Sequence, residues 1–125
     1  MQKYLFIALG GALGSVARYM VGAGVTNRLG LRFPYGTLII NISACLIIGF
    51  SLEMLNRHAN INPALRYLVP IGFVGAYSTF STFEWEIFSS LNSGAFWIAI
   101  LYVVTSLIFG LIAVALGAAA GRAIS

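Results

Sequence analysis

The sequence has very few residues that could perform covalent chemistry or bind a metal. Its 125 residues include one cysteine, one histidine and three acidic residues. The single Cys45 excludes an internal disulfide, and His58 lies in a polar stretch beside Arg57 and Asn60, where we expect a solvated surface role rather than a metal ligand. No nucleophile is paired with a base, and no phosphate-binding loop is present. We therefore expect no enzyme and no coupling to ATP.

Charge is scarce as well, whereas apolar residues are abundant. Only 8% of the residues are charged, and the seven Lys and Arg residues that give a net charge of +4 are scattered along the chain. They form no patch that would indicate nucleic-acid binding. In contrast, 60% of the residues are hydrophobic and the mean hydropathy is +0.95. This composition is typical of a membrane protein.

The length and the apolar segments predict an all-α membrane protein, a single domain with four transmembrane helices. A spanning helix needs about 20 mostly apolar residues, and we place the spans at residues 4–25, 37–55, 65–91 and 95–120. An even number of spans puts both termini on one side. The first span contains Arg18 and lacks a small-residue cleavage site followed by a polar mature domain, so we expect no removable signal peptide.

Basic residues are almost evenly divided between the two predicted sides. The side of the termini has Lys3, Arg57, Arg66 and Arg122, whereas the other side has Arg28 and Arg32, with Arg18 nearer to that end. Because Lys and Arg in loops set the orientation of membrane helices, this weak bias permits insertion both ways up and hence an antiparallel dimer. The alternative is a uniform orientation that other factors decide.

The third predicted span contains a polar block at membrane depth. Residues 75–83 read Gly-Ala-Tyr-Ser-Thr-Phe-Ser-Thr-Phe, and a buried hydroxyl without a partner costs about 1 to 3 kcal/mol. Pro70, Gly72 and Gly75 predict a break in the helix before the hydroxyl run. Such a break is tolerated where the freed backbone groups are buried in protein or face a cavity. Freed carbonyls favour a cation and freed amides an anion.

Polar residues form stripes on two other predicted helices. Thr37, Asn41 and Cys45 are spaced by four in the second span, and Tyr102, Ser106 and Gly110 are spaced by four in the fourth. Asn41 either joins helices together or lines an aqueous route, and Ser or Thr can simply bond to the carbonyl four residues earlier. The convergence of three polar stripes in four helices favours a common site.

Two further spacings concern packing and ion binding. Phe80 and Phe83 lie one helical turn apart, and their electropositive ring edges could hold a small anion, although ordinary packing is the alternative. Pairs of small residues spaced by four allow helices to approach closely in a bilayer. The two such pairs are Gly10 with Gly14 and Gly117 with Gly121.

These motifs resemble the Fluc (CrcB) family of fluoride channels. The resemblance rests on Thr-Leu-Ile-Ile-Asn at 37–41, the stretch 72–83 that ends in Ser-Thr-Phe-Ser-Thr-Phe, and Arg18 late in the first span. It covers essentially the whole chain in length, helix count and motif order. It implies passive fluoride export that relieves fluoride toxicity, by an antiparallel homodimer in the inner membrane with two narrow pores lined by both subunits.

The resemblance also assigns roles to individual residues. The fluoride pore would include Phe80, Phe83, Asn41, Thr37, Thr82, Tyr102 and Ser106. Gly110 departs from the family, whose members often have a hydroxyl there. Arg18 matches a vestibule arginine, which would concentrate anions at the mouth. Glu86 matches a family carboxylate, whereas we interpret Glu84 as a local feature at the membrane edge.

The resemblance further implies a structural sodium ion on the two-fold axis of the dimer. The backbone carbonyls of Gly75 and Ser78 from each subunit would coordinate it. Tyr77, beside these residues, is bulkier than the small aliphatic residue that many relatives have.

Two other functions remain as alternatives. A small multidrug or guanidinium exporter is also a four-helix, dual-topology dimer, but it needs an acidic residue in its first helix to bind a proton and a cation alternately. Residues 4–25 contain none, and they contain Arg18 instead. The other alternative is a subunit that is inactive without a paralogous partner.

Overall fold

The computed structural model describes residues 1–124, and within this range the chain crosses from end to end four times. Three crossings are single helices that are long and apolar enough to span a membrane: α1 (Gln2–Leu29), α2 (Tyr35–Arg57) and α6 (Phe96–Ala123). The third crossing consists of α3 (Ala64–Arg66), the π-helix η1 (Tyr67–Val74), α4 (Gly75–Tyr77) and α5 (Phe80–Asn92). The predicted all-α membrane fold with a broken third helix is thus confirmed.

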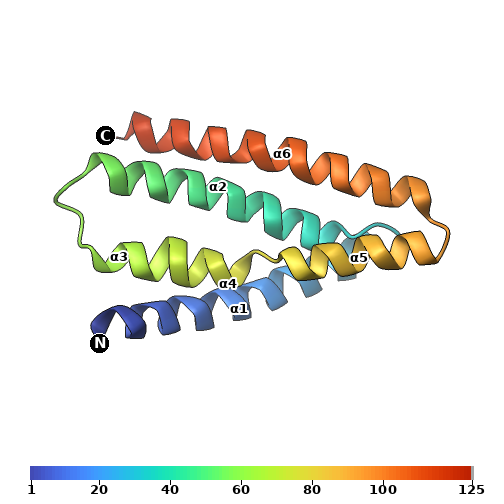
Figure 1. The fold of residues 1–125 in the computed structure, drawn as a ribbon, viewed down its shortest axis with the longest axis horizontal. Coiled ribbons are helices and arrows are strands. Elements are labelled where there is room, and N and C mark those ends of the chain that lie inside the picture. Colours follow the sequence, from blue (N-terminus) through green and yellow to red (C-terminus); the bar gives the residue numbers. More distant parts are fainter. Residues whose placement is uncertain (125) are drawn as a thin grey trace.

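The four crossings lie roughly side by side, and both termini are at the same end of the bundle (Figure 1). This arrangement confirms the expectation from an even number of spans. The connections at residues 30–34 and 93–95 contain Gly30 and Gly94, whose positive φ angles of 82° and 79° suit glycine. These short turns force sequential crossings to run antiparallel.

Glycines bring the backbones of neighbouring crossings into direct contact. A Cβ atom on Gly10 would lie 2.1 Å from the Leu68 carbonyl oxygen, and one on Gly14 would lie 2.3 Å from that of Phe73. On the other side of the bundle, a Cβ on Gly117 would lie 2.1 Å from the Leu46 carbonyl oxygen. The predicted packing role of these glycines is confirmed, since no other residue fits at such distances.

The third crossing breaks at a different place from the one that the sequence predicts. Pro70 and Gly72 lie inside η1, so the chain stays helical there. A π-helix is wound more widely than an α-helix, and Pro70 would remove a hydrogen bond and clash with a preceding carbonyl in an α-helix. The break falls instead at Ser78 and Thr79, whose ψ angles of 155° and 114° are extended. The prediction of a break before the hydroxyl run was wrong.

A small core lies where α2 faces the region just before the break. Ile40 and Ala44 of α2 pack against Val74 and Tyr77, and all four are buried. The Tyr77 ring stacks on Phe73 with centroids 5.4 Å apart, and its hydroxyl lies 2.9 Å from the Ser43 hydroxyl. The bulk of Tyr77 is therefore accommodated inside the subunit.

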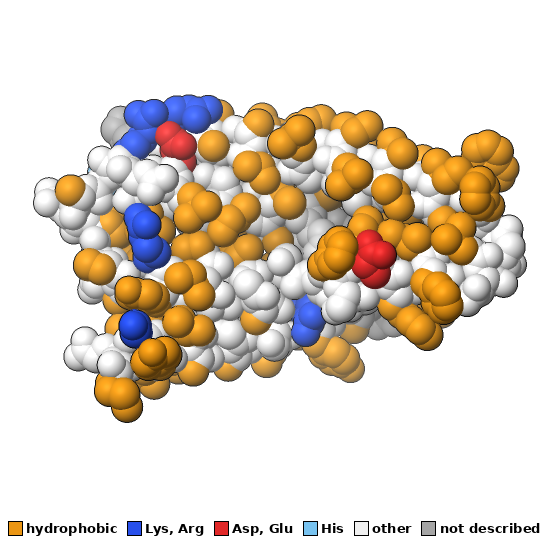
Figure 2. Space-filling model, in the orientation of Figure 1, with side chains coloured by type: hydrophobic (Ala, Val, Ile, Leu, Met, Phe, Trp, Pro, Cys, Tyr) orange, Lys and Arg blue, Asp and Glu red, His pale blue; other side chains and the backbone are white. Residues whose placement is uncertain are grey.

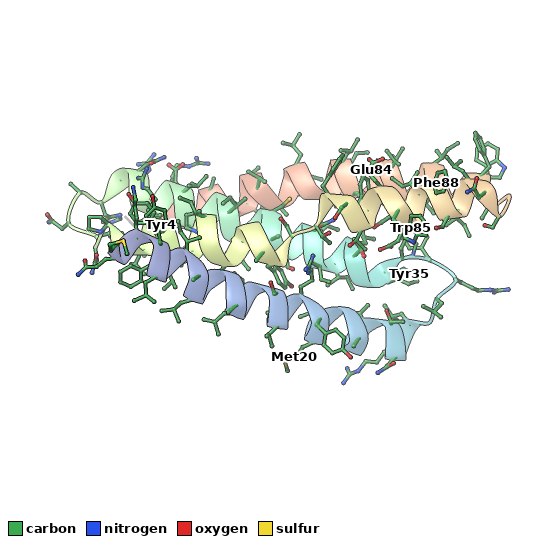
Figure 3. All side chains as sticks on the ribbon, turned by 60° about the horizontal axis from the view of Figure 1, so that its bottom comes forward. Tyr4, Met20, Tyr35, Glu84, Trp85 and Phe88 are labelled. Carbon is green, nitrogen blue, oxygen red and sulfur yellow. The ribbon has the colours of Figure 1, made fainter. Side chains whose placement is uncertain are left out.

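Most of the remaining surface is apolar. Figure 2 shows hydrophobic side chains along the length of the bundle, whereas Lys and Arg gather mainly at the end where the termini lie. Met20 points from α1 away from the bundle (Figure 3), and Leu107 on α6 is 67% exposed. Patches of this extent are rare on soluble monomers. They are expected of helices that face lipid.

Candidate functional site

The site is built around the break in the third crossing, which the side chain of Asn41 holds. The Thr79 backbone N–H donates to Asn41 Oδ1 at 2.9 Å, and Asn41 Nδ2 donates to the Thr79 carbonyl at 3.1 Å. One amide thus satisfies both polar groups of an extended residue that neither α4 nor α5 contains. Asn41 joins α2 to the break, which is one of the two roles left open by the sequence.

The side chain of Thr79 begins α5. Its hydroxyl oxygen accepts from the Thr82 backbone N–H at 3.3 Å and donates to Thr82 Oγ1 at 2.9 Å. A threonine in this position is a usual helix N-cap. The spacing of three that the sequence shows between Thr79 and Thr82 is therefore a cap, not two successive turns of one helix.

Three aromatic rings line up across α5 and α6. Phe80 and Phe83 have centroids 6.1 Å apart, and Phe83 meets Tyr102 edge-on at 4.9 Å with an interplanar angle of 61°. Phe83 is only 8% exposed, whereas Phe80 is 74% exposed and projects outward. The two phenylalanines therefore link the inside of the subunit to its outer face.

Polar side chains from three helices meet beside Phe83. The Thr37 hydroxyl donates a hydrogen bond to a Glu86 carboxylate oxygen, which ties α2 to α5. Tyr102 is fully buried, and its hydroxyl lies beside Thr37 and Glu86. The buried Ser106 hydroxyl, one turn further along α6, has no hydrogen-bond partner within residues 1–124. Because an unpaired buried hydroxyl is costly, the Ser106 hydroxyl beside this polar cluster is open to a polar ligand.

A cleft of about 410 Å³ opens next to this cluster. It lies between the end of α1, the turn at residues 30–34, the start of α2 and α5, with Thr37, Glu86 and Arg32 on its walls. Trp85, labelled on α5 in Figure 3, also lies on its walls. The cleft gives the Thr37–Glu86 pair a path to the end of the bundle away from the termini.

The structure brings most of the predicted pore residues together. Asn41, Thr37, Thr82, Phe83 and Tyr102 lie at the break or beside it, and Ser106 follows along α6. Phe80 is adjacent but faces outward. Arg18 is half-exposed on α1 and makes no hydrogen bond or ion pair with other described side chains. Whether these residues line a fluoride pore stays a prediction.

Other polar positions prove to be structural. The Thr105 hydroxyl donates to the Leu101 carbonyl at 2.7 Å, the back-bonding alternative. Gly110 faces Cys45, with 3.4 Å from an added Cβ to the Cys45 sulfur. An added Cβ there would make an ordinary contact with the sulfur.

Sequence reasoning missed two participants in the site. Thr79 is buried and bonded to Asn41 and Thr82, although it was not among the predicted pore residues. The partnership of Glu86 with Thr37 was also missed. Its signal was present, because Glu86 follows Phe83 by three residues and thus lies on the same face of α5.

Comparisons with known proteins agree on one family. The family model for CrcB-like protein, Camphor Resistance (CrcB), matches residues 5–118. A protein of Acidobacterium capsulatum named fluoride-specific ion channel FluC is 50% identical over 123 residues, which cover 98% of each chain. Proteins of the same name from Solibacter usitatus and Chloroflexus aurantiacus are 44% and 43% identical, over 97% and 98% of this chain and 99% and 97% of their own. The chain therefore belongs to the CrcB family.

Proposed function

We propose that this chain is the subunit of a fluoride-selective channel that exports fluoride passively across the inner membrane and so relieves fluoride toxicity. One observation carries the proposal: Thr37, Glu86 and Tyr102 bring polar groups together beside the buried ring of Phe83, and the Ser106 hydroxyl next along α6 has no partner among residues 1–124. The names of the relatives state both the ion and the channel activity. A channel of this kind is not an enzyme.

The chemistry of the cluster suits a small, tightly hydrated anion. A selective pore must replace the water of the ion with several donors in a narrow passage. The unpaired Ser106 hydroxyl would donate to the ion, the Tyr102 hydroxyl beside it would contribute a second donor, and the ring edges of Phe80 and Phe83 would add weak positive potential. The amide of Asn41 and the hydroxyls of Thr37 and Thr82 complete the proposed lining, and Arg18 would draw anions to the mouth.

An antiparallel homodimer would complete this pathway, because one subunit leaves half of it uncovered. Phe80 is 74% exposed and Gly75 is also exposed, although both lie at the middle of the third crossing. A second copy packed there would cover both residues and let each subunit contribute to both pores. The excess of basic residues at the end of the termini is weak, four against two or three, and so permits insertion both ways up. A paralogous subunit could take the same place.

A structural sodium ion fits the backbone at the break. In a continuous helix, the Thr79 N–H would bond to the Gly75 carbonyl and the Thr82 N–H to the Ser78 carbonyl. Both donors are bonded elsewhere, to Asn41 Oδ1 and to Thr79 Oγ1. The Gly75 and Ser78 carbonyls would therefore be open to a cation, and two subunits would supply four oxygens, which sodium favours as a hard ion. Such an ion would hold the two subunits together.

Fluoride efflux from liposomes that contain the purified protein tests the function. Valinomycin releases the counter-flow of potassium, and an electrode reads the external fluoride. We expect fast fluoride release and no chloride release in a matched experiment. No fluoride release, together with proton-coupled guanidinium transport, would instead favour the exporter. Fluoride flux that appears only when a paralogue is added would favour the subunit alternative.

Dual topology is tested separately, by a cysteine introduced at a terminal position in a variant that lacks Cys45. We expect a membrane-impermeant thiol reagent to label about half of the chains in inverted and in right-side-out vesicles alike. Labelling from one side only would contradict the antiparallel dimer.

A further inference from the structure

We propose that Asn41 and Thr79 are positioning residues that impose the break on the third crossing and thereby open the cation site. This inference rests on the proposed function, since the sodium ion belongs to it. The backbone at the break does not by itself require one, because neither Ser78 nor Thr79 is Gly or Pro. Neither has a positive φ angle. The cause therefore lies in side-chain hydrogen bonds, some made by Asn41 of α2 and one by Thr79 itself.

Asn41 supplies the first of these contacts. The Ser78 N–H still bonds to the Val74 carbonyl at 3.0 Å, as in a helix, and the pattern changes one residue later. There the Thr79 N–H leaves the Gly75 carbonyl and donates to Asn41 instead. The second bond, from Asn41 Nδ2 to the Thr79 carbonyl, fixes the extended conformation from both sides. Without Asn41, the Thr79 N–H can return to Gly75.

Thr79 supplies the second contact, through its own side chain. Its hydroxyl captures the Thr82 N–H, which would otherwise bond to the Ser78 carbonyl in a continuous helix. The two diverted donors are the natural partners of the two carbonyls proposed to bind sodium. Loss of either diversion would allow the helix to close over one carbonyl of each subunit, and hence over two of the four cation ligands.

The test measures sodium binding rather than flux, because Asn41 is also a proposed pore residue and its variants would lower flux in either case. The purified dimer is melted in sodium and in N-methylglucamine chloride, and the rise in melting temperature caused by sodium is recorded. We expect Asn41→Leu and Thr79→Val to lose most of this rise. Thr79→Ser keeps the cap and should keep the rise, and Asn41→Asp, which still accepts from the Thr79 N–H, should keep part of it.

Ser51→Ala is the matched control on α2, since the Ser51 hydroxyl bonds only to its own helix, at 2.7 Å to the Ile47 carbonyl. It should keep the full sodium response. A wild-type response in folded dimers of both Asn41→Leu and Thr79→Val would overturn the inference. If these variants do not fold, Thr79→Ser and Asn41→Asp provide the test. We expect Thr79→Ser to keep the sodium-induced rise in melting temperature and Asn41→Asp to keep part of it. An equal loss of this rise in both variants would contradict the roles given to the two sets of hydrogen bonds.

A wild-type protein that conducts fluoride but melts identically in both salts would overturn the inference and leave the proposed function standing. A wild-type protein whose melting temperature rises in sodium but that conducts no fluoride would overturn the proposed function and leave the inference standing. Hydrogen exchange gives a second readout in the wild-type protein. The Thr79 amide should be protected by its bond to Asn41, and rapid exchange of that amide would contradict the proposed role of this bond.

Discussion

The α2–α6 pair and the third crossing solve the problem of packing in a membrane in opposite ways. α2 and α6 are continuous helices that meet at Gly49 and Gly117, where an added Cβ would lie 2.3 Å and 2.1 Å from a carbonyl oxygen of the partner helix. The third crossing changes to a π-helix, breaks at Ser78 and Thr79, and is joined to α2 by side-chain hydrogen bonds.

The α2–α6 pair thus forms a rigid scaffold, whereas the broken third crossing forms the candidate site. Close packing of glycines stabilises helices in lipid without exposing polar groups, so the α2–α6 pair can be entirely regular. A break frees backbone groups that need partners, and the third crossing meets that need with Asn41, Thr79 and, as proposed, an ion. Damage to the scaffold should therefore affect folding, whereas damage to the break should affect assembly and flux.

The largest effect is expected from Gly117→Val, which disrupts the close contact between α2 and α6. Overpacking of a close contact costs about 1 to 3 kcal/mol or more, and here the new Cβ would lie 2.1 Å from the Leu46 carbonyl oxygen. We expect no monodisperse protein by size-exclusion chromatography. Gly11→Ala is the control, because nothing lies within 4 Å of its Cβ position. Normal yield and elution of Gly117→Val would contradict the scaffold role.

Gly75→Val should act on assembly and leave the subunit folded. The nearest atom to an added Cβ on Gly75 is the Pro70 carbonyl oxygen at 4.0 Å, so the subunit itself has space for a side chain. In the proposed dimer the partner occupies that space. We expect helical circular dichroism like that of the wild type together with a monomeric mass by light scattering, and a stable dimer would count against a subunit contact at Gly75.

Phe83→Ile should lower flux strongly and stability moderately. The substitution removes a buried ring that meets the Tyr102 ring edge-on at 4.9 Å. A loss of about 1.4 kcal/mol of ion stabilisation corresponds to roughly tenfold slower flux, and the aromatic pair accounts for about 1 kcal/mol of stability. Fluoride efflux and thermal melting are measured on the same preparation. Normal efflux from a folded variant would remove Phe83 from the pore.

Thr105→Val should have the smallest effect. The Thr105 hydroxyl bonds only within α6, at 2.7 Å to the Leu101 carbonyl and 3.2 Å to that of Tyr102. We expect flux within about twofold of the wild type and a stability change below about 0.5 kcal/mol. A large loss of flux would show that polar residues outside the cluster also take part in conduction.

The sequence predicts the fold well because membrane helices follow from apolar length alone, and it predicts the glycine seams because small-residue spacing is local. It also predicts the convergence of Thr37, Asn41 and Tyr102, since a spacing of four fixes a helix face. The position of the break is only partly local information, because Thr79 caps α5 but Asn41 lies on another helix. Pro70 predicts a break, but the chain stays helical there as the π-helix η1. The actual break at Ser78 depends on Asn41, 37 positions earlier in the sequence. Exposure of Phe80 likewise depends on three-dimensional packing.

The most direct test of the account compares fluoride efflux from liposomes that contain equal amounts of wild-type protein, Phe80→Ile and Leu107→Ala. Phe80 and Leu107 are both exposed apolar side chains, at 74% and 67%, but only Phe80 belongs to the broken crossing. The account predicts rapid fluoride release by the wild type and Leu107→Ala, and roughly tenfold slower release by Phe80→Ile. Equal release by all three proteins would contradict the claim that the ion passes at the break.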